Sequence, residues 1–227
     1  MGRKESRIQS WTNRFLLTIF IVLTTQYLIS SPVDDHQERF EDVALKIWEY
    51  AELGYLEEKS SGLLQQELED SGFTIQSGIA GIPTAFIAEY NNGGPVLGIL
   101  GEFDALPGLS QQNVPFKTAE GLSSANGHAC GHHLFGAASA WAVVAIKEWL
   151  EESGTPGTIR FYGTPAEEGG SGKVYIARDG YFDDVDVVLH WHPASGNSAD
   201  AQSSNSNKSG KFTFSGISAH AASAPEK

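Results

Sequence analysis

The sequence predicts an α/β domain with a mainly parallel sheet that carries helices on both faces. Two observations lead to this prediction: amphipathic helical segments alternate with short apolar strands, and polar turns separate them. Hydrophobic residues make up 41% of the 227 positions, which is enough to bury a core. Parallel strands need crossover connections, so helices between the strands favour a sheet that is covered on both sides.

Four segments have the pattern of helices. In residues 38–52, apolar side chains recur at the i, i+3, i+4, i+7 spacing of one helical face. Residues 61–71 predict a second helix that ends at Gly72, a residue suited to the position after a helix. Residues 134–152 predict the longest helix, with a buried apolar stripe, and residues 172–179 predict a short one.

Short apolar runs between these helices predict the strands. The first three runs are bounded by Gly, Pro or Asn, as strands in a compact domain usually are. The last run is expected to be a buried strand like the others. The predicted strands are residues 84–90, 96–100, 158–162 and 185–189.

The chain is predicted to have three parts. Residues 1–31 have a basic start, a short apolar run and then small residues, which is the pattern of a secretory signal peptide or an N-terminal anchor. The protein is therefore expected to be exported, to the periplasm or outside the cell, with membrane anchoring as the alternative. The main domain is predicted to be residues 32–207. Residues 208–227 begin a second, incomplete domain, which starts with a strand at residues 211–214 after a Ser- and Asn-rich linker.

The net charge argues against a nucleic-acid partner, and the cysteine content excludes an internal disulfide. The formal net charge is −13, whereas binding of nucleic-acid phosphates needs clustered Lys and Arg, so no nucleic-acid partner is expected. Cys130 is the one cysteine of the sequence, so an internal disulfide is excluded. A solitary thiol in an exported protein is prone to oxidation unless something occupies it.

Polar side chains that can bind metals follow three of the predicted strands and precede the longest helix. In a parallel α/β sheet, the carboxyl ends of strands and the amino ends of helices share the edge where ligands bind. These side chains are therefore expected to converge. They are Glu102 and Asp104, Glu167 and Glu168, His190 and His192, and the segment His128, Cys130, His132 and His133.

The residue types suit a divalent metal ion. Cys130 and His132, two positions apart, are good ligands for zinc-like ions, and His190 adds a nitrogen. Because neighbouring side chains diverge, one of Glu167 and Glu168 can bind a metal while the other serves as a general base toward water.

Each residue taken alone also has an ordinary structural explanation. Cys130 could be a small buried hydrophobe, and the adjacent Glu167 and Glu168 could be solvated. Asp104 could form a turn, and His220 could lie on the surface. Their convergence on one sheet edge is what favours a functional site.

Four motifs resemble the aminoacylase/carboxypeptidase family of dinuclear metallohydrolases, and within it the amidohydrolase branch. The motifs are GEFDALP, HACGH, PAEEG and LHWHP, and the resemblance extends over residues 40–227. It implies a zinc-peptidase-like catalytic domain with an inserted α+β lid domain that forms homodimers. One departure is His133, which stands where the branch usually has Asp or Asn.

The resemblance also implies residue roles. Glu167 matches the general base, Asp104 the acid that supports the site, and His220 a lid histidine that contacts the substrate and the developing oxyanion. The cofactors would be two divalent ions, zinc or manganese. Their implied ligands are Cys130, His132, Glu168 and His190.

The expected function is metal-dependent hydrolysis of an amide, such as an N-acyl amino acid or an aminobenzoyl-glutamate-like small molecule. Family members are about twice as long as this chain, so the rest of the lid and a further metal-binding histidine are expected beyond Lys227. The 227 residues alone are then expected to be insufficient for turnover. Three alternatives stay open: a dipeptidase with the same site, a non-catalytic metal-binding relic, and a hydrolase that uses Cys130 as its nucleophile.

Overall fold

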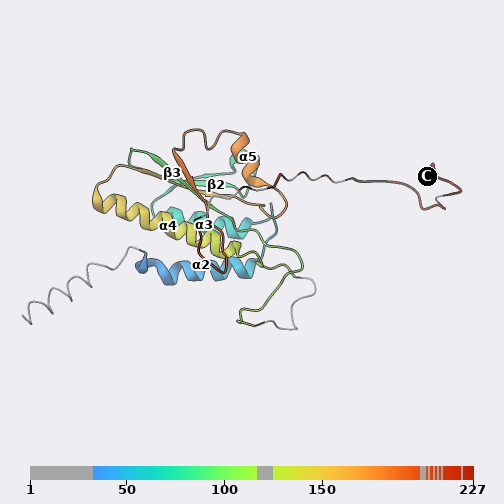
Figure 1. Ribbon diagram of the computed structural model, residues 1–227, viewed down its shortest axis with the longest axis horizontal. Helices are drawn as coiled ribbons and strands as arrows, with labels where there is room; N and C mark the ends of the chain where they lie inside the picture. Colours follow the sequence, from blue (N-terminus) through green and yellow to red (C-terminus); the bar gives the residue numbers. More distant parts are fainter. Residues whose placement is uncertain are drawn as a thin grey trace, which may run out of the picture. The chain divides into compact units, whose positions relative to one another are not determined.

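The computed structural model describes residues 33–116, 125–199, 203, 205, 206, 208, 210, 212–220 and 222–227 (Figure 1). These residues belong to two compact units, one ending at Pro193 and the other running from Ala194 to Lys227. The predicted signal or anchor segment, residues 1–31, lies outside the described residues. The predicted boundary at residue 207 stays a prediction.

The first unit is built on one five-stranded sheet with the order β1-β2-β4-β3-β5. Strand β3 is parallel to both β4 and β5, whereas β1 pairs with β2, and β2 with β4, in the antiparallel sense. The strands are β1 Thr74–Ser77, β2 Phe86–Asn91, β3 Val96–Gly101, β4 Thr158–Gly163 and β5 Val187–Leu189.

The predicted α/β fold class is confirmed, but two of the four strand pairings, β1 with β2 and β2 with β4, are antiparallel where parallel pairing was expected to dominate. Strand β1 has only one apolar residue, Ile75, and gives no strand signal in the sequence. Its connection to β2 is short, and a short connection returns the chain antiparallel, because a parallel return needs a crossover of a dozen or more residues. The three strands that precede the polar motifs, β3, β4 and β5, are parallel as predicted.

Helices cover both faces of the sheet, as predicted. Helices α2, α3 and α4 pack on one face, while α5 and the short 3-10 helix η2 lie on the other (Figure 1). All four predicted helices are present, with ends shifted by no more than a few residues. Their bounds are α2 Gln37–Tyr50, α3 Glu58–Asp70, α4 His132–Ser153 and α5 Gly172–Arg178, with 3-10 turns η1 Asp34–His36 and η2 Ile79–Gly81.

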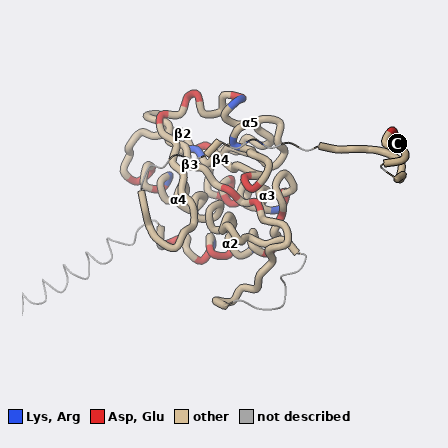
Figure 2. The backbone as a smooth tube through the Cα atoms, turned by 45° about the vertical axis from the view of Figure 1, so that its right-hand side comes forward, with Lys and Arg blue, Asp and Glu red and all other residues tan. Residues whose placement is uncertain are grey.

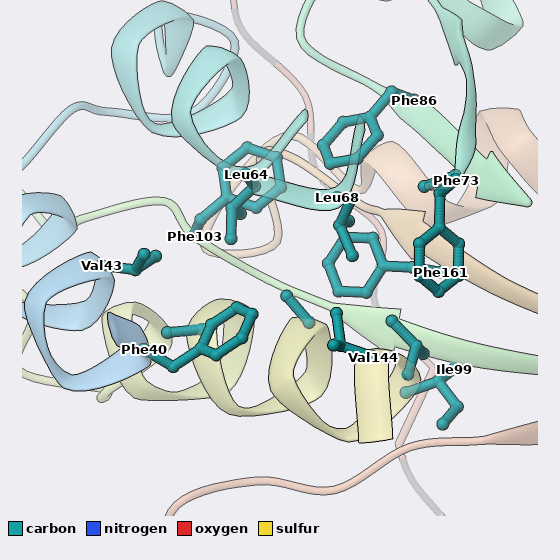
Figure 3. Close-up of a cluster of buried hydrophobic side chains, with 14 of the residues drawn as sticks. Phe40, Val43, Leu64, Leu68, Phe73, Phe86, Ile99, Phe103, Val144 and Phe161 are labelled. Carbon is teal, nitrogen blue, oxygen red and sulfur yellow. The ribbon is translucent and has the colours of Figure 1, made fainter. Parts of the chain in front are cut away.

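The side chains of β4 divide between two cores. Ile159 and Phe161 join the larger cluster under α2, α3 and α4, whereas Tyr162 joins the smaller cluster beside α5. This alternation is the period-two pattern of a strand that is covered on both sides. Figure 3 shows the larger cluster, to which the sheet contributes Phe161 and the helices contribute Phe40 and Leu64. Burial of each such side chain contributes about 1.5–3 kcal/mol.

The prediction of a buried β5 is wrong. Val187, Val188 and Leu189 are all exposed, because β5 is the edge strand and pairs only with β3 in the described part of the chain. An apolar run shows that a strand can be buried, but burial also needs an element that covers it.

In the second unit, the strand predicted at residues 211–214 is also wrong for its described part. Residues 212–214 have no strand structure, and the rings of Phe212 and Phe214 are exposed. A strand needs a neighbour to accept its hydrogen bonds, and the described residues of this unit provide none.

Acidic positions are spread over the helices and loops of the first unit, with few basic positions between them (Figure 2). Among the described residues, no helix combines the length and the apolar character that crossing a bilayer requires.

Candidate metal centre

The polar motifs meet at one rim of the sheet. Strands β3 and β4 end in register at Gly101 and Gly163, and β5 ends beside Ile99 of β3. Because these strands are parallel, the segments that follow them all leave at the same edge. Helix α4 begins at this edge with His132. The rim therefore collects acidic, imidazole and thiol groups from four distant parts of the sequence.

Gly131 sets the direction in which α4 begins. Its φ of +82° lies in the left-handed region, which favours glycine, and its carbonyl accepts hydrogen bonds from the backbone N–H groups of Leu134 and Phe135. A β-carbon at this position would also lie 3.0 Å from the Pro193 ring. This turn brings Cys130 and His132, on either side of the glycine, to the same site.

His132 is the centre of the site and is fully buried. Its Nδ1 donates to Asp104, at 2.8 Å from Oδ1 and 3.1 Å from the backbone oxygen. Its Nε2 lies 3.0 Å from Glu102 Oε2 and 3.9 Å from Glu167 Oε2. A carboxylate that holds one ring nitrogen and leaves the other toward a cluster of donors is the usual arrangement around a metal-binding histidine.

The charges around His132 are those of a site that attracts a cation. Burial by itself lowers the pKa of His132, but the carboxylates of Asp104 and Glu102 outweigh this effect and raise the pKa to about 11. The ring therefore holds a proton between two anions when no cation is present. A divalent cation at Nε2 would replace that proton.

Asp104 connects the histidine to the paired glutamates. It is buried, and while Oδ1 accepts from His132, Oδ2 accepts a hydrogen bond of 2.9 Å from the backbone N–H of Glu168. Asp104 therefore fixes both an imidazole and the turn that carries Glu167 and Glu168, which is a positioning role.

Among the described residues, two groups of side chains have a geometry that could hold a metal ion, and both include His132. In each group the ligand atoms lie within 4.8 Å of one another. The sulfur of Cys130 lies 3.3 Å from Nε2 of His192, which is a separation that two ligands of one ion can have. The groups are Cys130, His132 and His192, and Glu102, His132 and Glu167.

The residues present fit a divalent ion. Three buried atoms of the cluster have no hydrogen-bond partner in the described structure: Glu102 Oε2, His132 Nε2 and Glu168 Oε1. Buried polar atoms are rarely left without a partner, and a role in binding an ion is one ordinary explanation. Thiol, imidazole and carboxylate groups are also the donors that zinc-like ions accept.

His190 lies at the same rim but outside both groups. Its Nε2 is 3.5 Å from Glu102 Oε1, and its ring packs edge-on against Phe135 at 5.0 Å. Trp191 donates a hydrogen bond of 2.9 Å to Ser139 on α4, which ties this loop to the helix. In the described structure, the neighbour of Cys130 is thus His192 rather than His190, although the resemblance implies His190 as a ligand.

Glu168 and Cys130 are only partly buried. Burial raises the pKa of Glu168, with Asp104 and Glu167 adding to the effect against His132. Burial likewise raises the pKa of the Cys130 thiol, and Glu168 adds to it against His132. A nucleophilic cysteine needs a lowered pKa, so this setting counts against the alternative in which Cys130 attacks the substrate.

Glu57 is a residue of the site that the sequence gives no signal for, since an acid before a helix is ordinary. It is fully buried, and it accepts hydrogen bonds from the backbone N–H of Ala166 at 2.8 Å and from Thr84 at 3.1 Å. Ala166 has a φ of +57°, which is unfavourable for a residue with a side chain. Glu57 therefore holds a strained turn directly before Glu167.

His133 lies in neither ligand group. Its ring packs against that of His128 at 5.2 Å, and burial, with His128 and His132 nearby, lowers the pKa of His133 to about 4. His128 donates to the backbone oxygen of Ile47 at 3.0 Å. Both rings are therefore neutral near pH 7, and His133 does not supply the negative charge that Asp would supply at this position.

His220 belongs to the second unit and is exposed. Its Nδ1 lies 3.3 Å from the hydroxyl of Ser223, and its carbonyl accepts from the backbone N–H groups of Ser223 and Ala224. Its expected contact with a substrate stays a prediction.

Comparison with known proteins supports the motif-based resemblance. The chain is 43% identical over 197 residues to one of the subunits of the p-aminobenzoyl-glutamate hydrolase of Escherichia coli, covering 87% of this chain and 41% of that protein. It is 33% identical over 184 residues to the human Xaa-Arg dipeptidase, covering 74% of this chain and 38% of the relative. The chain thus spans about two fifths of the length of these relatives.

Comparison with solved structures points to the same group of proteins. A dinuclear metal-binding peptidase of the M20 family from Bacillus subtilis matches with a TM-score of 0.60 and 26% identity, over 71% of this chain and 44% of that one. Residues 98–208, which include every residue of the rim, match the model of peptidase family M20/M25/M40. The chain belongs to this peptidase family.

Proposed function

We propose that this chain is the metal-binding part of an amidohydrolase that cleaves the amide bond of an N-acyl amino acid or an aminobenzoyl-glutamate-like small molecule. The observation that carries the proposal is the buried His132, held by Asp104 at one nitrogen and open at the other to thiol, imidazole and carboxylate donors. The identity of 43% to an aminobenzoyl-glutamate hydrolase supports the substrate class.

Two divalent ions are the proposed cofactors. Cys130, His132, Glu168 and His190 are the proposed ligands, and Glu168 Oε1 is one of the unpartnered buried atoms that support them. The thiolate of Cys130 favours zinc by its softness, whereas the carboxylates of the rim also suit manganese. Titration of the metal-free protein with each ion separates the two.

When bound, such ions supply the Lewis acidity that polarises the amide carbonyl and acidifies a water molecule. Glu167 is the proposed general base: its carboxylate is 45% exposed, so substrate and water can reach it, while Asp104 fixes the turn behind it. It removes a proton from water and returns a proton to the leaving amine. His220 is proposed to contact the substrate from the lid.

Replacement of the general base tests this proposal. In the full-length protein, Glu167→Ala is expected to lower kcat by about 10²–10⁴-fold with bound metal unchanged, because the proton acceptor is lost and the ligands are not. Hydrolysis of aminobenzoyl-glutamate and metal analysis of the same preparation measure both quantities. Glu152→Ala, at an exposed position of α4, is the control. Near-normal turnover by a metal-loaded Glu167→Ala protein would contradict the assignment.

A dipeptidase is the second candidate, and the identity of 33% to an Xaa-Arg dipeptidase is the observation in its favour. The two candidates share the proposed site and differ in whether the substrate has a free amine. A comparison of kcat/KM for dipeptides and for the same compounds with acylated amines decides between them.

The proposal also covers the protein as a whole. A longer chain is proposed to form a homodimer through the lid, to be exported with the help of residues 1–31, and to bind small-molecule amides rather than nucleic acid. Sedimentation measures the dimer, and cell fractionation measures export. A non-catalytic metal-binding relic would bind metal without any chelator-sensitive amidase activity.

A further inference from the structure

Glu102 is a buried carboxylate to which the proposed ligand set gives no role. It follows β3 directly, and the residue is only 2% exposed. Charged side chains are almost never this deeply buried unless they are paired or bind a metal. What each of its two oxygens meets therefore decides its role.

Oxygen Oε1 has protein partners. It accepts a hydrogen bond from the ammonium group of Lys173 in the first turn of α5, and it lies 3.5 Å from Nε2 of His190. Together with the His132 ring, this lysine outweighs the effect of burial and lowers the pKa of Glu102 to about 2.

Oxygen Oε2 is buried and makes no hydrogen bond of acceptable geometry in the described structure. It lies 3.0 Å from Nε2 of His132, the other buried atom of the pair without a hydrogen bond. Apart from its ion pair with the His132 ring, this oxygen has no partner in the described structure to compensate its burial. Glu102 Oε2 and His132 Nε2 are therefore placed to bind the same cation.

The separation of the two atoms fits one metal ion. Oxygen and nitrogen ligands lie at about 2.0–2.2 Å from zinc, so two of them on one ion are roughly 3–3.5 Å apart. The distance between Glu102 Oε2 and His132 Nε2 is 3.0 Å, and an oxygen of Glu167, the proposed general base, lies within 4.8 Å of both atoms.

We propose that Glu102 is a ligand, through Oε2, of the divalent ion that His132 binds through Nε2. The proposal rests on the proposed function and adds a ligand to it. Lys173 is the positioning residue: by occupying Oε1, it leaves a single oxygen of Glu102 for the ion. It also offsets part of the negative charge that Glu102, Asp104, Glu167 and Glu168 bring to the rim.

Metal binding by the full-length protein tests the proposal. Metal-free wild-type, Glu102→Gln and Lys173→Met proteins are titrated with Co²⁺, and stoichiometry, affinity and the visible absorption spectrum are recorded. Glu102→Gln is expected to lower the affinity for one of the two ions by at least about 100-fold and to change the absorption spectrum, because a ligand is lost. Lys173→Met is expected to weaken binding by about 10-fold, the lower end of the effect of outer residues, with little change in the spectrum.

Glu89→Gln is the control, because Glu89 is likewise a carboxylate paired with a cation, Arg160 at 2.5 Å, but is only partly buried and lies outside the site. If Glu102→Gln does not fold, Glu102→Asp gives the same readout, since the shorter side chain withdraws the oxygen. A Glu102 variant with wild-type affinity and spectrum for both ions would overturn the proposal. A wild-type protein that binds no metal would instead overturn the proposed function.

Discussion

At the scale of single residues, Glu57 illustrates how the site is held rather than how it reacts. Burial raises the pKa of its carboxyl to about 7, against the hydrogen bonds from Ala166 and Thr84. The residue accepts a proton in the folded protein at a pH where the unfolded chain has already lost it. Folding is therefore linked to the protonation of a side chain that the reaction does not use.

The sign of this linkage gives a prediction. Because the pKa of Glu57 is raised on folding, the free energy of unfolding is expected to fall as pH rises from about 4.5 to 7, by on the order of 3 kcal/mol. Glu57→Gln keeps an acceptor for Ala166 and is expected to remove this decline. Urea unfolding of metal-free protein at pH 5 and pH 8 measures it.

Glu69→Gln, at an exposed position of α3, is the control for that experiment. An equal loss of stability between pH 5 and pH 8 in the wild type and in Glu57→Gln would show that the carboxyl of Glu57 does not titrate as described.

At the scale of elements, the site depends on how closely α4 approaches the end of β3. Gly136 lies on α4, and a β-carbon there would lie 2.7 Å from the backbone oxygen of Glu102. The glycine is therefore needed for a close approach between the helix and the segment that carries Glu102 and Asp104. A β-carbon at Gly62, near the start of α3, would meet no other part of the described structure within 4 Å.

Substitution by alanine is expected to change the stability of the protein in opposite directions at Gly62 and at Gly136. Gly62→Ala is expected to stabilise the protein by about 0.5–1 kcal/mol, because alanine favours a helix. Gly136→Ala gains the same preference but is expected to destabilise the protein by about 1–3 kcal/mol, because the helix must move away from Glu102. Thermal unfolding of both variants provides the measurement. Stabilisation by both would mean that the approach of α4 is not tight.

At the scale of the whole molecule, the rim concentrates negative charge in a chain that is already acidic. Glu102, Asp104, Glu167 and Glu168 gather around His132, and the sequence has a net charge of −13. Without a cation these carboxylates repel one another. Bound cations would therefore stabilise the fold as well as serve the reaction.

Chelation is expected to destabilise the full-length protein for this reason. A ligand at about 1,000 times its Kd stabilises the folded state by about 4 kcal/mol. The Tm of the metal-loaded protein is thus expected to fall on addition of a chelator and to recover with excess zinc or manganese. The double variant Cys130→Ser, His132→Ala is expected to show neither change. A Tm that does not respond in the wild type would contradict a metal-bound rim.

Sequence alone determines the main helices, most of the strands and the place of the rim, because the residue patterns that predict them are local. The stripe of apolar residues in residues 134–152 predicts α4, and polar residues after three apolar runs predict a rim. Parallel strands share an edge, so the convergence of Cys130, His132 and the paired glutamates follows from their places along the chain.

Tertiary structure decides what depends on distance between remote residues. Cys130 and His192 meet across 62 positions, and Lys173 reaches Glu102 across 71. Such contacts are set by strand register and helix packing, neither of which leaves a periodic mark in the sequence. The same cause explains the antiparallel β1 and the exposed β5, since pairing and coverage belong to the neighbours of a strand and not to its own residues.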